Sequence, residues 1–135
     1  MLQLARSVVY ALRAIFFLAD QAQGKISFVN EISVRQGLPR DYLAKLLQRL
    51  VKAELIESSR GPKGGFRLAR PANRITLLEV VEAVSGPPNM WNCNLKISCP
   101  MTQKCPFHPV WKEANDKIAE VLGGKTVAEM MKNAK

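Results

Sequence analysis

The chain has 135 residues, of which 47% are hydrophobic, and carries a net charge of +9. One domain usually has ~100–200 residues, so we expect one compact domain with an appended element and exclude disorder over the whole length. Three cysteines do not fit a closed disulfide framework, and no segment reaches the ~18 apolar residues of a membrane span, so we expect a cytoplasmic protein with reduced thiols and no membrane partner.

An apolar segment near the start of the chain predicts the first helix. Its hydrophobic residues recur at the three- and four-residue intervals of one helical face, and Gly24 follows as a stop signal. We expect the buried face to comprise Val8, Leu12, Ile15, Phe16 and Ala19.

Two further helices are predicted on either side of Gly37. The segment "SFVNEISVRQGL" has a short apolar face of Val29, Ile32 and Val34, and Gly37 breaks the pattern. The segment "PRDYLAKLLQRLVKAEL" follows, with Pro39 suited to the first turn of a helix that ends near residue 55. Its apolar positions are Leu43, Leu46, Leu47, Leu50 and Val51. Two short helices joined at a glycine predict a helix-turn-helix motif.

The next segment, "IESSRGPKGGFRLAR", predicts a β-hairpin. Phe66 and Leu68 alternate with Arg67, which is typical of a strand, and the glycines and proline before them favour a turn. Arg60 and Lys63 would lie at the tip of the hairpin. A hairpin directly after a helix-turn-helix is a wing.

The rest of the chain predicts three helices around a cysteine-bearing loop. Thr76 and Glu79 form a capping box for the helix "LLEVVEAV", which ends at Gly86, and Thr126 with Glu129 caps a short terminal helix. Between them, a longer helix begins near residue 107. Its apolar stripe, spaced like a coiled-coil seam, consists of Phe107, Trp111, Ala114, Ile118 and Val121.

These elements predict a mainly α fold with a small β-hairpin wing. Residues 1–86 would form a winged helix-turn-helix DNA-binding domain, residues 87–106 a cysteine-bearing loop, and residues 107–135 a long helix with a C-terminal tail.

The charge distribution favours DNA as the partner of the first region. Residues 1–75 contain 13 Lys and Arg against 5 Asp and Glu, so nearly the whole positive excess lies there. A basic region with a helix-turn-helix and a basic hairpin is typical of double-stranded DNA binding, although such a polar face can also be merely solvated. The candidate DNA-binding residues are Arg35, Arg40, Tyr42, Lys45, Gln48, Arg49, Arg60 and Lys63.

All cysteines and the only histidine gather in one short stretch. Cys93, Cys99, Cys105 and His108 have the spacing C-x5-C-x5-C-x2-H. Soft thiolates select zinc or iron–sulfur clusters, and four donors suffice for either, while the alternatives are incidental thiols and a surface histidine. Neither an acid pair nor a Ser-His-Asp set accompanies the stretch, so we do not expect an enzyme.

The wing "SSRGPKGGFRLAR", the opening "YALRAIFFLA" and the triple-cysteine loop with its following helix resemble the Rrf2 family of bacterial winged-helix regulators, which includes IscR and NsrR. The resemblance extends from Leu2 to about Val127. It implies a homodimer held by the long helix after the cysteines and bound to a palindromic operator. It also implies a two-iron or four-iron cluster whose state, set by iron supply, oxygen or nitric oxide, changes operator affinity.

The family resemblance also bears on the fourth ligand of the cluster. In the IscR-like branch a histidine three residues after the last cysteine fills this role, and His108 matches that position. The NsrR branch instead uses an acidic residue from the first helix of the partner chain, at the position directly before "YALR", where this chain has Val9, which cannot ligate. The resemblance thus favours His108 as the fourth ligand, with a solvent or small-molecule ligand as the alternative. The alternatives are a winged-helix regulator that uses the cysteines as a zinc site or thiol redox switch, and a small iron–sulfur electron carrier.

Overall fold

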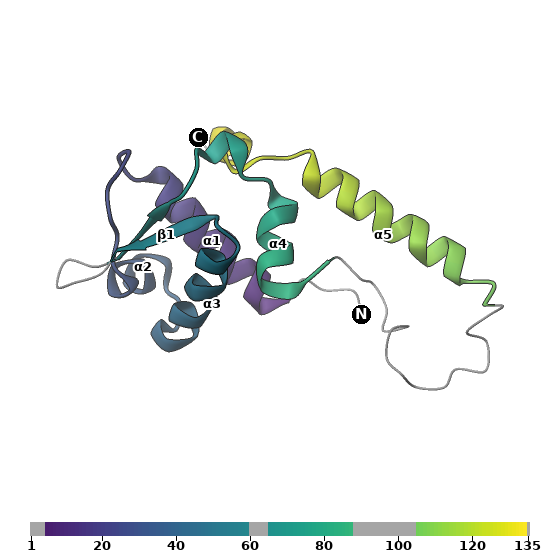
Figure 1. Cartoon of the computed structure of the whole chain (residues 1–135), viewed down its shortest axis with the longest axis horizontal. Coiled ribbons are helices and arrows are strands. Elements are labelled where there is room, and N and C mark those ends of the chain that lie inside the picture. Colours follow the sequence, from purple (N-terminus) through teal and green to yellow (C-terminus); the bar gives the residue numbers. More distant parts are fainter. Residues whose placement is uncertain (1–4, 60–64, 88–104, 135) are drawn as a thin grey trace.

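The computed structural model describes residues 5–59, 65–87 and 105–134 (Figure 1). The helices and strands are α1 Arg6–Asp20, α2 Val29–Gln36, α3 Arg40–Lys52, β1 Ile56–Ser59, β2 Gly65–Leu68, the short 3-10 helix η1 Ala72–Arg74, α4 Leu77–Ser85, α5 His108–Gly123 and α6 Val127–Asn133. The chain is mainly helical with a two-stranded hairpin directly after a helix-turn-helix, which confirms the predicted winged-helix class. Helices α1–α4, the hairpin and α6 form a head, and α5 extends from it as an arm (Figure 1).

Helix α1 lies at the centre of the head. The predicted residues Val8 and Ile15 are buried, but Phe16 is only half-buried, and Phe17 and Leu18 are buried as well. The buried surface is wider than one stripe because α1 packs against α2, α3, α4, α6 and β2. The helix ends at Asp20 rather than near Gly24, which instead lies in the following loop.

The helix-turn-helix is formed by α2 and α3. Gly37 is the C-cap of α2 in the left-handed conformation, with φ of 64°, which glycine adopts without the steric cost of a side chain. Pro39 is the N-cap of α3 and therefore precedes its first turn. The prediction that Val34 belongs to the apolar face was wrong, since 80% of this residue is exposed. A helix of eight residues buries only the positions that face α1 and α3, and in α2 the fully buried position is Ile32.

The predicted hairpin is present, with β1 antiparallel to β2 and Ile56 opposite Leu68. An isolated β-bridge, which was not predicted, joins the hairpin to Ser27, whose backbone N–H and C=O each pair with Phe66 at 2.8 Å. The hairpin is thereby anchored to the start of the helix-turn-helix. The tip, with Arg60 and Lys63, lies outside the described residues.

Both predicted capping boxes are formed. In α4, the backbone N–H of Glu79 donates to Thr76 Oγ1 at 3.2 Å, and the Thr76 N–H donates back to the Glu79 carboxylate at 3.1 Å. Arg70 donates to the same carboxylate at 2.7 Å. Burial alone would raise the pKa of Glu79, but the Thr76 N–H and the Arg70 guanidinium outweigh burial and lower it.

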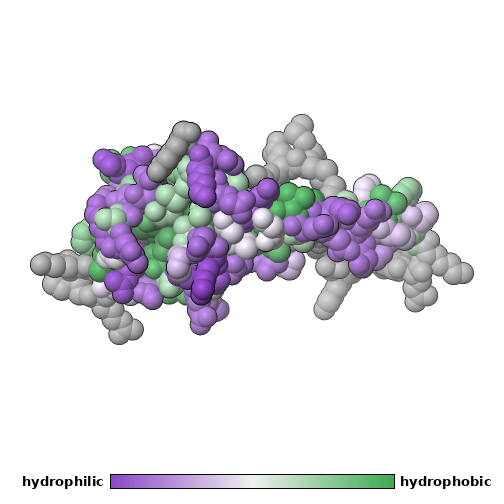
Figure 2. All heavy atoms as spheres, turned by 90° about the horizontal axis from the view of Figure 1, so that it is seen from above, coloured by the Kyte–Doolittle hydropathy of each residue, from purple (hydrophilic) through white to green (hydrophobic). Residues whose placement is uncertain are grey.

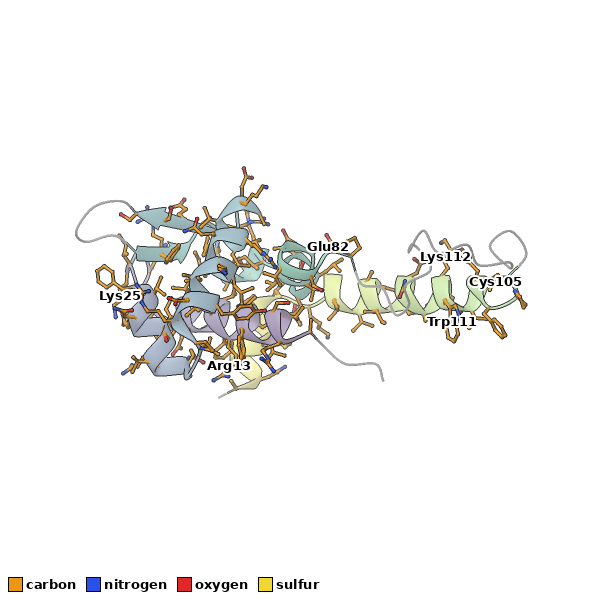
Figure 3. All side chains as sticks on the ribbon, turned by 90° about the horizontal axis from the view of Figure 1, so that it is seen from below. Arg13, Lys25, Glu82, Cys105, Trp111 and Lys112 are labelled. Carbon is orange, nitrogen blue, oxygen red and sulfur yellow. The ribbon has the colours of Figure 1, made fainter. Side chains whose placement is uncertain are left out.

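The C-terminal residues close the head. Thr126 caps α6 and pairs with Thr76 in an isolated bridge, and Val127, which is buried, donates its N–H to Ile75 at 2.9 Å. The last turn of α5 reaches the head, where Leu122 packs against the core. One end of the arm is therefore fixed to the head, while its other end carries Cys105 away from it (Figure 3).

Candidate nucleic-acid interface and cysteine segment

The outward face of α3 is polar over its whole length. Asp41, Lys45, Gln48 and Lys52 are all exposed and recur at intervals of four, three and four residues, which places them on one side of the helix. The leucines of α3 are buried on the opposite side. The face therefore presents hydrogen-bonding groups of the kind that contact base edges and phosphates, and two of its residues, Lys45 and Gln48, are among the predicted DNA-binding residues.

The predicted residue Arg40 lies on one flank of α3, beside α2 and the wing. Its Nε donates to Asn30 Oδ1, and its Nη1 lies 3.3 Å from the Asp41 carboxylate. A hollow next to it separates α3 from the wing. Its polar lining consists of Asn30, Arg40, Gln48, Ser58 and Ser59.

Tyr42 and Arg49 lie seven residues apart on the other flank of α3, and each contacts another helix of the head. The Tyr42 ring meets Tyr10 of α1 edge to face, with centroids 5.7 Å apart. The Arg49 Nη1 donates to the Val84 carbonyl at 3.0 Å, in the last turn of α4. Both residues are exposed at their remaining surface.

Arginines at the end of α2 border the same interface. Arg35 is exposed in the last turn of α2, as a DNA-contacting residue there would be. Arg13 of α1 donates from Nη2 to the Gln36 carbonyl, at the C-terminal end of α2. A guanidinium there balances the partial negative charge of the helix end and holds the turn before α3.

Of the predicted metal ligands, the structure describes Cys105 and His108. Cys105 is half-buried, and His108 is exposed and is the first residue of α5, with its backbone N–H 3.4 Å from the Cys105 carbonyl. Cys93 and Cys99 lie outside the described residues, and the described ranges contain no cluster of three metal-ligating side chains. The structure thus places two of the four predicted donors together at the far end of the arm.

A hollow extends from His108 to the end of α4. It is lined by Glu82, Pro87, His108, Lys112, Asn115, Asp116 and Ala119. The start and the end of the cysteine segment, residues 87–106, therefore flank one side of the arm.

The arm also exposes the predicted apolar stripe. The exposed fraction is 57% for Phe107, 61% for Val121 and 37% for Trp111. Ala114 and Ile118 are half-buried. Val110, at 57%, is an additional exposed hydrophobic residue that the predicted stripe did not include. Figure 2 shows hydrophobic residues at the surface along the arm, and Figure 3 shows that Trp111 and Lys112 point to different sides of it.

None of the helices in the described part of the chain is long and apolar enough to cross a membrane.

The sequence profile of the Rrf2 family, described as iron-dependent transcriptional regulators, matches residues 4–133. The chain belongs to the Rrf2 family. It is therefore a DNA-binding transcription regulator rather than an enzyme, which confirms the family resemblance and the absence of catalysis expected from the sequence.

Several relatives of this Rrf2 chain are similar over most of its length. It is 36% identical to the HTH-type transcriptional regulator IscR of Xenorhabdus nematophila over 92% of this chain and 76% of that protein. It is 34% identical to Protein aau3 of Rhizobium meliloti over 97% of this chain and 86% of that protein. Among solved structures, T. potens IscR matches with a TM-score of 0.79 and 30% identity over 99% of this chain and 89% of that one. Staphylococcus aureus CymR matches with a TM-score of 0.74 and 25% identity over 93% of this chain and 95% of that chain.

Two residues of this Rrf2 protein that support the candidate interface through contacts at the ends of α2 were not predicted from the sequence. Asn30 and Arg13 each fix one end of α2 through a contact with a side chain or carbonyl more than nine positions away in the chain. Both are polar residues outside the apolar stripes, and hydrophobic periodicity gives no signal for contacts between segments distant in the chain.

Proposed function

We propose that this Rrf2 regulator is a homodimer whose affinity for a palindromic operator is controlled by an iron–sulfur cluster. Cys93, Cys99, Cys105 and His108 would hold the cluster, which contains two or four irons. The observation that carries the proposal is the position of Cys105 and His108, three residues apart where α5 begins. This is where the chain passes from the cysteine segment into the arm.

The donor set fits such a cluster. Three thiols and one imidazole provide four protein ligands, and soft thiolates prefer iron–sulfur clusters or zinc over hard cations. Cys105 is partly shielded from water, and His108 begins a helix whose C-terminal end is fixed to the head. When bound, the cluster supplies a group that oxygen, nitric oxide or iron shortage can alter or remove.

The protein's own residues then connect this site to DNA. The cysteine segment enters from Pro87, after the last turn of α4, and ends at α5. Four ligands from the segment and from the start of α5 would restrain it between these two anchors. Loss of the bonds to the cluster releases this restraint. Operator affinity then changes if the two heads of the dimer have different relative positions in the cluster-bound and cluster-free states.

The arm supports the homodimer. A helix that exposes Phe107, Val110 and Val121 on a chain of this size provides an apolar surface that a second copy can cover. Two-fold symmetry would give each recognition helix its own half-site, with half-sites about 34–36 Å apart or a multiple of that distance. The similarity to IscR proteins agrees with this arrangement.

Zinc is the second candidate for the same donors, because thiolate and imidazole also suit a structural zinc site. A zinc-bound or metal-free protein could still act as a thiol redox switch. The third alternative, an electron carrier, is disfavoured because the chain belongs to a family of transcription regulators.

The proposal is tested by anaerobic purification of the wild type, followed by absorption spectroscopy, iron and sulfide analysis and native mass spectrometry. We expect visible absorbance and a mass increase equal to two or four irons with their sulfides. Cys99→Ala should abolish both, whereas Lys112→Ala, a matched change on the arm, should leave both unchanged. A wild type that carries zinc alone, or a Cys99→Ala variant with an unaltered spectrum, would contradict the ligand assignment.

A further inference from the structure

The contact between Arg49 and Val84 joins α3, the second helix of the helix-turn-helix, to the end of α4. The Arg49 Nη1 donates to the Val84 carbonyl at 3.0 Å, and within the described residues this is the one side-chain hydrogen bond between α3 and α4. Carbonyls in the last turn of a helix lack intrahelical partners and carry partial negative charge, so a guanidinium is a favourable donor there. The bond therefore supplements the apolar packing of the two helices.

The acceptor, the Val84 carbonyl, lies in the last turn of α4, directly before the cysteine segment begins. Gly86, the C-cap, has φ of 79° and ψ of −177°, a conformation that is essentially restricted to glycine, and its N–H donates to Glu82 at 3.1 Å. Pro87 follows directly. A displacement of the cysteine segment would first move this turn. The Val84 carbonyl, which accepts the hydrogen bond from Arg49, would move with it.

Arg49 lies to one side of the outward polar face of α3. That face carries Lys45 and Gln48, whereas Arg49 shares a flank with Tyr42, which packs on α1. An open hollow adjoins the guanidinium, so it has room to move when its acceptor moves. The hollow is lined by Arg49, Lys52, Ala53, Ala83, Val84 and Gly86.

We propose that Arg49 is a positioning residue and not a ligand of DNA: it sets the orientation of α3 by holding the last turn of α4. Through this bond, a change in the cysteine segment alters the orientation of the outward polar face of α3, which carries Lys45 and Gln48. The first statement stands on the described contacts alone, and the second rests on the proposed function.

The positioning role is tested by the salt dependence of operator binding, with Arg49→Gln compared with Lys45→Gln on the outward face of the same helix. Each phosphate contact contributes about one unit to the slope of log affinity against log salt concentration. We expect Lys45→Gln to reduce the slope by about one unit per protomer. Arg49→Gln should lower operator affinity by about threefold to tenfold and leave the slope unchanged, and an equal loss of slope would overturn the role.

Gly86→Ala gives a second test that does not alter charge. It strains the turn that presents the Val84 carbonyl, so it should also weaken operator binding, and its effect should largely disappear in the Arg49→Gln background. Independent, additive losses in the two variants would overturn the positioning role. Circular dichroism of each variant ensures that only folded protein is compared.

The transmission is tested with Cys105→Ser in the wild-type and Arg49→Gln backgrounds. We expect Cys105→Ser to change the operator affinity of the anaerobic wild type about tenfold and that of Arg49→Gln by less than about threefold, a difference in coupling of about 0.7 kcal/mol. The same factor in both backgrounds would overturn the transmission and leave the proposed function standing. No effect in the wild type would overturn both, while the salt slope still decides the positioning role.

Discussion

Among the glycines that the structure describes, Gly65 has the least room for a side chain. A Cβ at this position would lie 2.6 Å from Ile26 Cγ2 and 2.7 Å from the Ser27 carbonyl oxygen. The oxygen cannot move freely, since it accepts the hydrogen bond from Phe66 that anchors the wing. Forcing an extra carbon into packed surroundings costs about 1–3 kcal/mol, so Gly65→Ala should lower the free energy of unfolding by about 2 kcal/mol.

The prediction is checked by urea unfolding followed by circular dichroism, with two glycines as references. Gly37→Ala meets no atom within 4 Å but must adopt a positive φ of 64°, so it should cost about 1–2 kcal/mol from backbone strain alone. Gly124, with φ of −90°, has a helical conformation, and its replacement by alanine should change stability by less than about 0.5 kcal/mol. A Gly65→Ala variant as stable as Gly124→Ala would refute the steric argument.

Three further changes test the arm and the capped helices. Val121→Glu places a charge on the apolar stripe of the arm and should convert a dimer to monomers in light scattering; an unchanged dimer mass would count against that interface. Thr126→Ala removes the cap of α6 and should lower the free energy of unfolding by about 1 kcal/mol, measured in urea, and a neutral result would show that the capping box contributes nothing. The lowered pKa of Glu79 stabilises the fold above its ordinary value of 4.5, and this stabilisation is lost as pH falls through the lower pKa of the folded state. Acidification should therefore destabilise the wild type more than Glu79→Gln, and identical pH profiles would argue against the contacts with Thr76 and Arg70.

The fold was largely predictable because its signals are local. Capping boxes, glycine punctuation and the leucine spacing of α3 each depend on residues within one or two helical turns, and the helices form where these signals predict them. The errors arose where distant segments decide the outcome. Val34 is exposed because none of the described elements covers its side of α2, and Ser27 pairs with Phe66 from 39 positions away.

The candidate site was predictable in composition more than in arrangement. Residue type and charge made Lys45, Arg49 and the cysteines candidates, but hydrophobic periodicity distinguishes only buried from exposed positions. It could not reveal that Arg49 holds the end of α4, since Val84 offers a backbone carbonyl and any residue type carries one. Cys105 and His108 were predicted as donors because both residue types are rare in this chain and lie close together.

The most direct test of the central claim is operator affinity measured anaerobically for the same protein before and after removal of its iron. The account predicts affinities that differ by at least about tenfold, which is about 1.4 kcal/mol, and predicts that the difference vanishes in Cys99→Ala. Equal affinities for the iron-loaded and stripped wild type would contradict it.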